Sequence, residues 1–140
     1  MLRGMTTLNL WAADLPAAVR WYTELLGVEP YFSSEAAGRG PGYVEFRIGD
    51  YQHELGLIDR RFAPPGLAAQ PGGAICYWHV DDLPAALERV LSMGARELEP
   101  ITERGPGFVT ASVLDPFGNV LGLMHNRHYL AVLEARDGQR

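Results

Sequence analysis

The sequence predicts an α+β fold made of two βαβββ modules, each a curved sheet with its helix on the convex side. Three observations lead to this prediction. Short segments recur in the same order at an offset of 65 to 68 residues. Each copy begins with strand-like alternation, which is followed by a capped helical pattern. Glycine and proline residues then separate three further strand-like segments in each copy.

Four pairs of matching segments define the internal repeat. They are Trp11–Val19 with His79–Leu87, Leu26–Gly27 with Met93–Gly94, Arg39–Val44 with Arg104–Val109, and Leu55–Ile58 with Leu121–Met124. We expect one domain over residues 1–140, with a first module at about 5–62, a linker at 63–73, a second module at about 74–127 and a tail at 128–140. Neither module is large enough to form a stable core alone, so two modules should pair, either within one chain or between two chains.

The first module opens with a strand and a helix. Residues 7–10 alternate between polar and apolar, which is typical of a strand buried on one face. Asp14 can cap the first turn of a helix, and Pro16 suits that turn. Gly27 is placed to end the helix. Apolar residues recur at helical spacing between these points, namely Leu15, Ala18, Tyr22 and Leu25.

The remaining elements follow from turn residues. In the first module we expect strands at Glu29–Ser33, Tyr43–Ile48 and Gln52–Ile58, with turns at 38–42 and 49–50. In the second module we expect a strand at 74–80, a helix at 83–93 and strands at 96–101, 108–114 and 119–125, with turns at 104–107 and 115–118. The tail at 128–134 is weakly helical and could cover a sheet edge or a partner subunit.

Composition excludes several classes of protein. With 47% hydrophobic and 21% charged residues, the chain is typical of a globular protein, and no apolar stretch is long enough to cross a membrane. A net charge of −5 argues against nucleic acid as a partner. The single cysteine, Cys76, excludes an internal disulfide framework. All 12 basic residues are arginine, which excludes lysine-based covalent chemistry. No signal peptide is visible, so we expect a cytoplasmic protein.

Two motifs resemble the vicinal oxygen chelate superfamily, which includes glyoxalase I, extradiol dioxygenases and bleomycin-resistance proteins. The first is Ala13–Leu15 followed by Trp21–Gly27, which is similar to the family's opening helix. The second is Leu114–Asn119, which is similar to the D-P-x-G-N turn before the last strand. The resemblance implies that the two curved sheets enclose a shared cavity. It also implies a small organic molecule as the partner and a homodimer as the assembly.

The resemblance also implies where a divalent metal would be held in the enzymes of the family. The corresponding positions are Thr7, Glu54, Ile75 and Gly122. The repeat would also allow Gly56 in place of Glu54, and a register shift of one residue would bring Cys76 to the third position. Only Glu54 in the main set is a competent ligand, whereas a catalytic site needs about three. We therefore expect no metal cofactor, with a divalent metal as the alternative.

Glu54 is the candidate for catalysis. A carboxylate on the apolar wall of a cavity is costly unless it is paired, so its presence there indicates a role. It could anchor a ligand or act as a general base. Alternatively, it could pair with Arg47 on the neighbouring strand, or hold a weakly bound ion.

Aromatic residues provide the main positive indication of a binding site. By alternation from the implied metal positions, the cavity face would carry Trp11, Tyr43, Tyr77 and Phe108, with Asn9, Glu45, Thr110 and Met124. Thr7, Ile75, Gly122 and His79 complete the expected lining. Large rings with a few polar groups are typical of a site for a flat organic ligand. The alternative is that the rings only fill the interior between the sheets.

The other histidines give no clear site. His79 should lie on the cavity side near the end of its strand, whereas His53 and His125 should face the helix or the rim. His128 lies beyond the last strand.

Three functions remain open. The first is a protein that binds a small aromatic molecule without catalysis, as bleomycin-resistance proteins do, and the sequence favours it. The second is a metal-dependent lyase or dioxygenase of the glyoxalase or extradiol type. The third is a metal-free enzyme that uses Glu54 as a general base.

Overall fold

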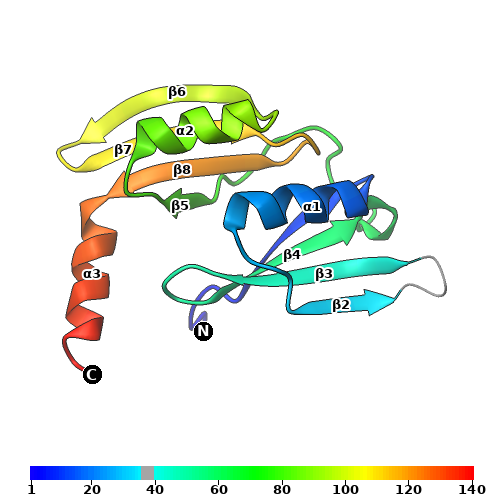
Figure 1. The fold of residues 1–140 in the computed structure, drawn as a ribbon, viewed down its shortest axis with the longest axis horizontal. Helices are drawn as coiled ribbons and strands as arrows, with labels where there is room; N and C mark the ends of the chain where they lie inside the picture. The colour runs from blue at the N-terminus through cyan, green and yellow to red at the C-terminus, as the bar shows by residue number, and fades with distance from the viewer. Residues whose placement is uncertain (36–39) are drawn as a thin grey trace. The chain divides into compact units, whose positions relative to one another are not determined.

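The computed structural model describes residues 1–35 and 40–140. It consists of two compact units, Met1–Ala69 and Gln70–Arg140. Each unit contains one four-stranded mixed sheet, and a helix lies against one face of each sheet (Figure 1). The predicted α+β fold of two βαβββ modules is confirmed.

The first unit follows the order β1, α1, β2, β3, β4 and a short 3-10 helix. Their bounds are β1 (Thr7–Ala12), α1 (Leu15–Leu26), β2 (Phe32–Glu35), β3 (Pro41–Ile48), β4 (His53–Asp59) and η1 (Arg60–Phe62). The spatial order of the strands is β1-β4-β3-β2. β1 runs parallel to β4, and the other neighbours are antiparallel. The first and last strands of the module therefore lie side by side.

Helix α1 begins and ends where its capping residues predict. The Asp14 side chain accepts a hydrogen bond from the backbone N–H of Ala17 at 3.1 Å, which satisfies one of the free donors of the first turn. Gly27 ends the helix with φ at 68°, a left-handed conformation that glycine adopts without strain. The apolar side of α1 packs on the sheet through Leu15, Ala18 and Tyr22, all of which are 1% exposed.

Only one face of the first sheet contacts α1. The buried strand residues on that face include Ala12, Val44, Phe46, Leu55 and Leu57. Because side chains alternate along a strand, the residues between them point to the opposite face. We call this opposite surface the first helix-free face.

The second unit repeats this arrangement and adds a C-terminal helix. Its elements are β5 (Tyr77–His79), α2 (Leu83–Ser92), β6 (Arg96–Gly105), β7 (Phe108–Leu114), β8 (Val120–Asn126) and α3 (Arg127–Asp137). The strand order is β5-β8-β7-β6, with β5 parallel to β8. Asp82 caps α2 as Asp14 caps α1, accepting from the N–H of Ala85 at 3.0 Å.

The core of the second unit also lies under its first helix. α2 buries Leu83, Leu87 and Val90 against one face of the sheet. On that face the sheet contributes Ala111, Val113, Leu121 and Leu123. The opposite surface is the second helix-free face. In the turn before β8, the Asp115 carboxylate accepts hydrogen bonds from the N–H groups of Phe117 and Asn119, both at 2.8 Å.

Several predicted boundaries were wrong. β5 spans three residues instead of 74–80, because only Tyr77–His79 pair fully with β8, so Ile75 precedes the strand. β2 begins at Phe32 rather than at residue 29, because Pro30 lacks the N–H that pairing requires. β6 extends to Gly105 through three register shifts. Of the turn predicted at 38–42, residues 38 and 39 lie outside the described residues.

The tail forms helix α3, which continues from β8 (Figure 1). Asn126 caps it by accepting from the N–H groups of His128 and Tyr129 at 2.9 and 3.0 Å. None of the α3 residues is buried. In the described part of the chain, no helix has the length and apolar character that a membrane crossing requires.

Candidate functional site

The first helix-free face consists of three rows of residues that run across β1, β4 and β3. The pairing register places Trp11, Ile58 and Tyr43 in one row, and Asn9, Gly56 and Glu45 in the next. The third row contains Thr7, Glu54 and Arg47. The predicted site residues of the first module therefore share one face, and they divide it into an aromatic row, a central row and a charged row.

Both oxygens of the Glu54 carboxylate have protein partners. The Thr7 hydroxyl donates to Oε2 at 2.6 Å, and Arg47 forms an ion pair with Oε1 at 3.2 Å. Arg47 is also held by the Tyr31 ring, 4.7 Å from its guanidinium carbon, and by the Gln52 carbonyl at 3.5 Å. The structure therefore has the ion pair with Arg47 that was the alternative interpretation of Glu54.

Glu45 and Tyr43 form a second polar pair on the same face. The Tyr43 hydroxyl donates a hydrogen bond to the Glu45 carboxylate. Burial raises the pKa of Glu45, the negative charge of Glu54 raises it further, and Arg47 opposes the rise. Burial and the charge of Glu54 likewise raise the pKa of Tyr43. Ionisation of the Glu45 carboxylate is thus disfavoured.

Gly56 has no side chain, and this leaves space for neighbouring side chains to lie over the central row. A Cβ atom at this position would lie 2.3 Å from the Asn9 side-chain oxygen and 2.8 Å from the Tyr43 ring. Only glycine leaves room for both side chains in their present positions. The Asn9 amide and the Tyr43 ring therefore converge beside Glu45.

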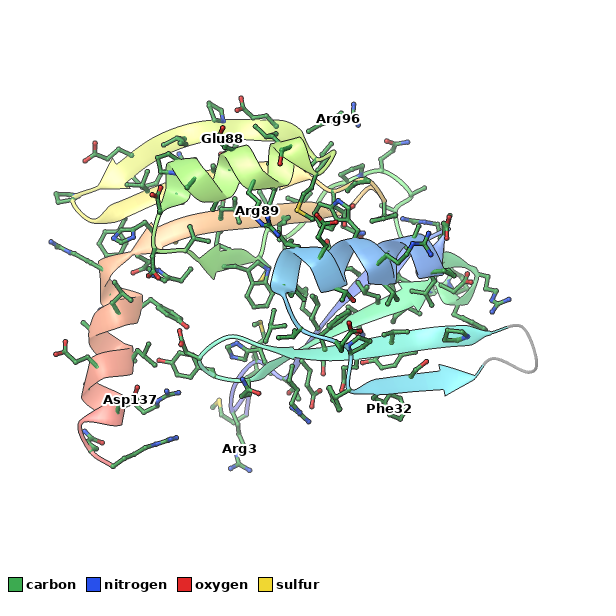
Figure 2. All side chains as sticks on the ribbon, viewed as in Figure 1. Arg3, Phe32, Glu88, Arg89, Arg96 and Asp137 are labelled. Atoms are coloured by element: carbon green, nitrogen blue, oxygen red, sulfur yellow. The ribbon has the colours of Figure 1, made fainter. Side chains whose placement is uncertain are left out.

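Phe32 is a further aromatic residue of this face that the sequence analysis missed. It pairs with Glu45 across β2 and β3, and its ring centroid lies 6.2 Å from that of Tyr43. Phe32 is 50% exposed and projects from the sheet on the side away from α1 (Figure 2). The alternation of β2 could have indicated it only if the pairing of β2 with β3 had been known.

The second helix-free face also brings its predicted residues together. Tyr77 pairs with Gly122, and His79 pairs with Met124, which in turn pairs with Thr110. Phe108 lies on the same face at the end of β7, next to Asn126. The Thr110 hydroxyl accepts from Nε of Arg104 at 3.1 Å, so one polar group of this face is already engaged.

Ser112 is a residue of the second helix-free face that the sequence analysis omitted. It lies between Gly122 and Glu99 in the pairing register and is 0% exposed. Its hydroxyl has no hydrogen-bond partner among the described residues. Its position two residues after Thr110 was the signal that could have identified it.

Gly122 has crowded surroundings like those of Gly56. A Cβ atom on Gly122 would lie 2.7 Å from both the Cys76 carbonyl oxygen and the Tyr77 ring, and 3.0 Å from an Ile75 methyl group. Ile75 thus lies beside Gly122, as expected from the positions that the resemblance implies for metal ligands, although it precedes β5. Cys76 instead contributes its backbone carbonyl, which accepts from the Gly122 N–H at 3.1 Å. Burial raises the pKa of its thiol.

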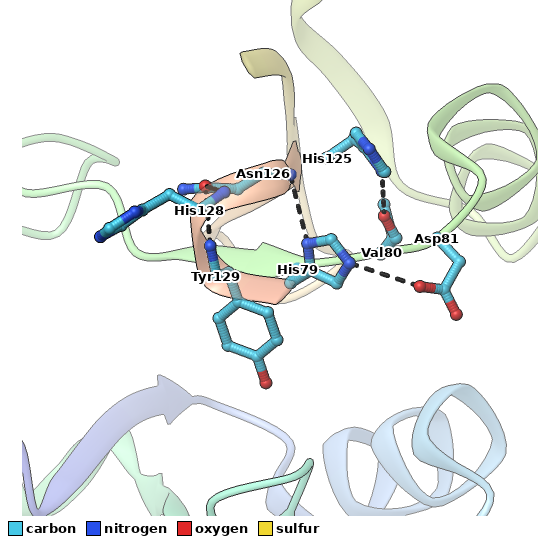
Figure 3. Close-up of polar contacts among 7 residues, drawn as sticks. All are labelled: His79, Val80, Asp81, His125, Asn126, His128 and Tyr129. Atoms are coloured by element: carbon cyan, nitrogen blue, oxygen red, sulfur yellow. Dashed lines mark hydrogen bonds and ion pairs between the residues drawn. The ribbon is translucent and has the colours of Figure 1, made fainter. Parts of the chain in front are cut away.

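His79 connects β5, β8 and α3 (Figure 3). Its Nδ1 accepts from the Asn126 N–H at 3.2 Å, and its Nε2 lies 3.3 Å from an Asp81 oxygen. Its ring stacks on Tyr129 with a centroid distance of 4.7 Å. His79 therefore has a structural role at the point where α3 begins.

The remaining histidines lie away from the helix-free faces, as the alternation predicts. His125 faces the α2 side and contacts the Val80 carbonyl at 3.3 Å. His53 stacks on Tyr51 with a centroid distance of 5.8 Å. His128 is exposed in α3.

The positions that the resemblance implies for metal ligands do not form a suitable donor set. The repeat aligns Asn9 opposite Gly56 with Tyr77 opposite Gly122, so Gly56 rather than Glu54 is the counterpart of Gly122. Neither glycine has a donor side chain. Across residues 1–35 and 40–140, no three His, Cys, Asp or Glu residues are grouped closely enough to hold a metal ion. The residues present do not fit the metal site of the family's enzymes.

Comparisons with known proteins agree with the fold and the motifs. The family model described as the Glyoxalase/Bleomycin resistance protein/Dioxygenase superfamily matches residues 4–123. No curated protein matches the chain. Among solved structures, a glyoxalase-related enzyme from Fulvimarina pelagi is 21% identical, with a TM-score of 0.70 over 90% of each chain.

Two further solved structures are similar to the chain. TioX from Micromonospora sp. ML1 is 17% identical, with a TM-score of 0.63 over 88% of this chain and 98% of its own. A glyoxalase/bleomycin resistance protein from Catenulispora acidiphila DSM 44928 is 21% identical, with a TM-score of 0.57 over 86% and 97%. These likenesses show the fold, and the family model adds that the chain belongs to the glyoxalase/bleomycin resistance protein/dioxygenase superfamily.

Proposed function

We propose that this protein binds a small aromatic molecule on its helix-free faces and does so without a catalytic metal. The observation that supports this function is the composition of the first helix-free face. Trp11, Tyr43 and Phe32 surround a few polar groups there, an arrangement suited to a flat organic ligand. The implied metal positions, in contrast, lack donor side chains at Ile75 and Gly122.

The two enzymatic alternatives have less support from the geometry. A metal-dependent lyase or dioxygenase needs about three protein ligands, which the implied positions do not provide. A metal-free enzyme with Glu54 as its base would first have to release that carboxylate from Thr7 and Arg47. Binding requires neither change.

A thermal-shift screen of planar aromatic compounds tests the proposal. A compound at a hundredfold excess over its Kd should stabilise the wild type by about 2.7 kcal/mol. Trp11→Ala and Tyr77→Ala, one from each helix-free face, should reduce this shift. Phe62→Ala is the matched control, because it removes a ring that is 52% exposed and lies outside both faces.

The same variants distinguish the competing functions. If compounds stabilise Trp11→Ala and Tyr77→Ala as strongly as the wild type, the proposal that they bind on these faces is wrong. If a compound is consumed, and Glu54→Gln stops its turnover without weakening its binding, the metal-free enzyme replaces the binding protein.

A further inference from the structure

We infer that the ligand is an organic cation, an amine or quaternary ammonium attached to an aromatic body, and that Glu45 is the residue that selects its charge. This inference rests on the proposed function, because it assigns a ligand class to the first helix-free face. It follows from the charges of that face, from the rings around Glu45 and from the Asn9 side-chain oxygen beside it.

Of the two carboxylates on the described part of the first helix-free face, one forms an ion pair and the other does not. Arg47 pairs with Glu54 and is held in place by Tyr31 and Gln52. Glu45 lies in the adjacent row, and within residues 1–35 and 40–140 the only hydrogen-bond partner of its carboxylate is the Tyr43 hydroxyl. Among the described residues of this face, Glu45 is therefore the carboxylate that forms no ion pair.

Aromatic rings flank this carboxylate. Phe32 lies directly across from Glu45 on β2, and Tyr43 lies two residues away on β3. A cation held by the Glu45 carboxylate would therefore lie near the faces or edges of both rings. Attraction between a cation and an aromatic ring favours this position, and it does so more strongly where water is excluded. An anionic ligand would be repelled by Glu45, and a neutral ligand would leave the carboxylate uncompensated.

A further acceptor lies on the opposite side of Glu45. The Asn9 side-chain oxygen extends over Gly56, the residue that pairs with Glu45 across β3 and β4. An ammonium group with N–H donors could use this oxygen together with the carboxylate. The absent side chain at Gly56 is what allows the amide to reach this position.

The ionisation of Glu45 is consistent with such a ligand. Its pKa is raised by burial and by Glu54, so the free protein bears a cost for the charged carboxylate. The titratable or charged groups that face Glu45 are Tyr43, Arg47 and Glu54, and only Arg47 opposes the rise. A bound cation would lower this pKa, and by linkage protonation of Glu45 should release the cation.

A matched pair of probes tests the inference by isothermal titration calorimetry. The probes are 4-(trimethylammonio)benzyl alcohol and 4-tert-butylbenzyl alcohol. They share a shape and neither of them titrates, but only the first carries a positive charge. At about pH 7 the wild type should bind the cation at least about tenfold more tightly than the neutral probe. This preference should decline as the pH falls towards about 4.

Two variants assign the preference to Glu45. Glu45→Gln keeps an acceptor for the Tyr43 hydroxyl, so the fold should be retained, and the preference for the cation should fall to about twofold or less. Glu88→Gln, which changes the net charge by the same amount on the exposed side of α2, should leave the preference unchanged (Figure 2).

The outcomes separate the inference from the proposed function. If both probes bind the wild type equally and Trp11→Ala weakens both, the cation inference is wrong and the aromatic-binding function stands. If the preference for the cation survives Glu45→Gln, the assignment to Glu45 is wrong. If neither probe binds at millimolar concentration, both the inference and the binding function on this face are contradicted.

Discussion

The hydroxyl of Tyr43 donates a hydrogen bond to the carboxylate of Glu45, two residues further along β3. Residues two apart on a strand point to the same face, so this contact needs no distortion of the backbone. The pair is separate from the Thr7–Glu54–Arg47 chain in the adjacent row. The polar groups of the first helix-free face thus form one network that contains an ion pair and one pair whose carboxylate has no ion-pair partner among the described residues.

The first prediction concerns the pH dependence of stability. Because the pKa of Glu45 is raised in the folded state, the folded protein retains its proton to a higher pH than the unfolded chain does. The free energy of unfolding should therefore fall as the pH rises through the interval between the two pKa values. Glu45→Gln should reduce this fall and be slightly more stable than the wild type at about pH 7, because it removes a charge that the folded state disfavours. Urea denaturation at a series of pH values measures both effects, and a less stable Gln variant at neutral pH would contradict them.

The second prediction compares the two crowded glycines. At Gly56 a new Cβ would meet the ends of two side chains, which can rotate away, so Gly56→Ala should cost about 1 kcal/mol. At Gly122 it would meet the Cys76 backbone carbonyl at 2.7 Å, which cannot move as easily. Gly122→Ala should therefore cost about 2 to 3 kcal/mol. Equal losses in chemical denaturation would show that the contacts of Gly122 are not more rigid.

The third prediction concerns the unpaired hydroxyl of Ser112. Removing a buried polar group that has no partner should be neutral or stabilising, by up to about 1 kcal/mol in Ser112→Ala. Thr110→Val is the comparison on the same strand, because it removes the hydrogen bond from Arg104 and should destabilise by about 1 kcal/mol. Thermal unfolding of both variants measures the difference. A loss of stability in Ser112→Ala would indicate that its hydroxyl is satisfied in solution.

The fourth prediction concerns His79 and the start of α3. His79→Phe can keep a ring next to Tyr129 but removes the acceptor of the Asn126 N–H. The free energy of unfolding should fall by about 1 to 2 kcal/mol, and amide exchange should increase in the first turn of α3. His128→Ala, at an exposed position of the same helix, should change neither quantity. Unaltered exchange in His79→Phe would show that the ring nitrogen does not hold this junction.

The fifth prediction is that the protein binds no stoichiometric metal. Elemental analysis after purification without chelators should find nickel, zinc, iron and manganese well below one equivalent, because Ile75 and Gly122 offer no donor side chain. Near-stoichiometric metal that disappears in Glu54→Ala would contradict this and would favour the metal-dependent alternative.

Local features of the sequence were sufficient for the module order and for the faces of the strands. Asp14 and Gly27 marked the ends of α1 because capping depends on residues within one turn. The alternation along β1 and β3 placed Trp11 and Tyr43 on the face opposite the helix, because side-chain direction has a period of two in any strand. These features depend on neighbours in the chain and could be predicted without a structure.

Pairings between strands were decided only by the tertiary structure. Glu54 could be placed on the same strand face as the other candidate site residues, but its engagement by both Thr7 and Arg47 depends on the register of β1 and β3 against β4. The same holds for Phe32 opposite Glu45 and for the shortness of β5. Register is set by packing over the whole sheet, which joins residues far apart in sequence. The sequence therefore determined which residues could form a site. The strand pairing decided that Glu54 forms an ion pair with Arg47 and that Glu45 forms none among the described residues.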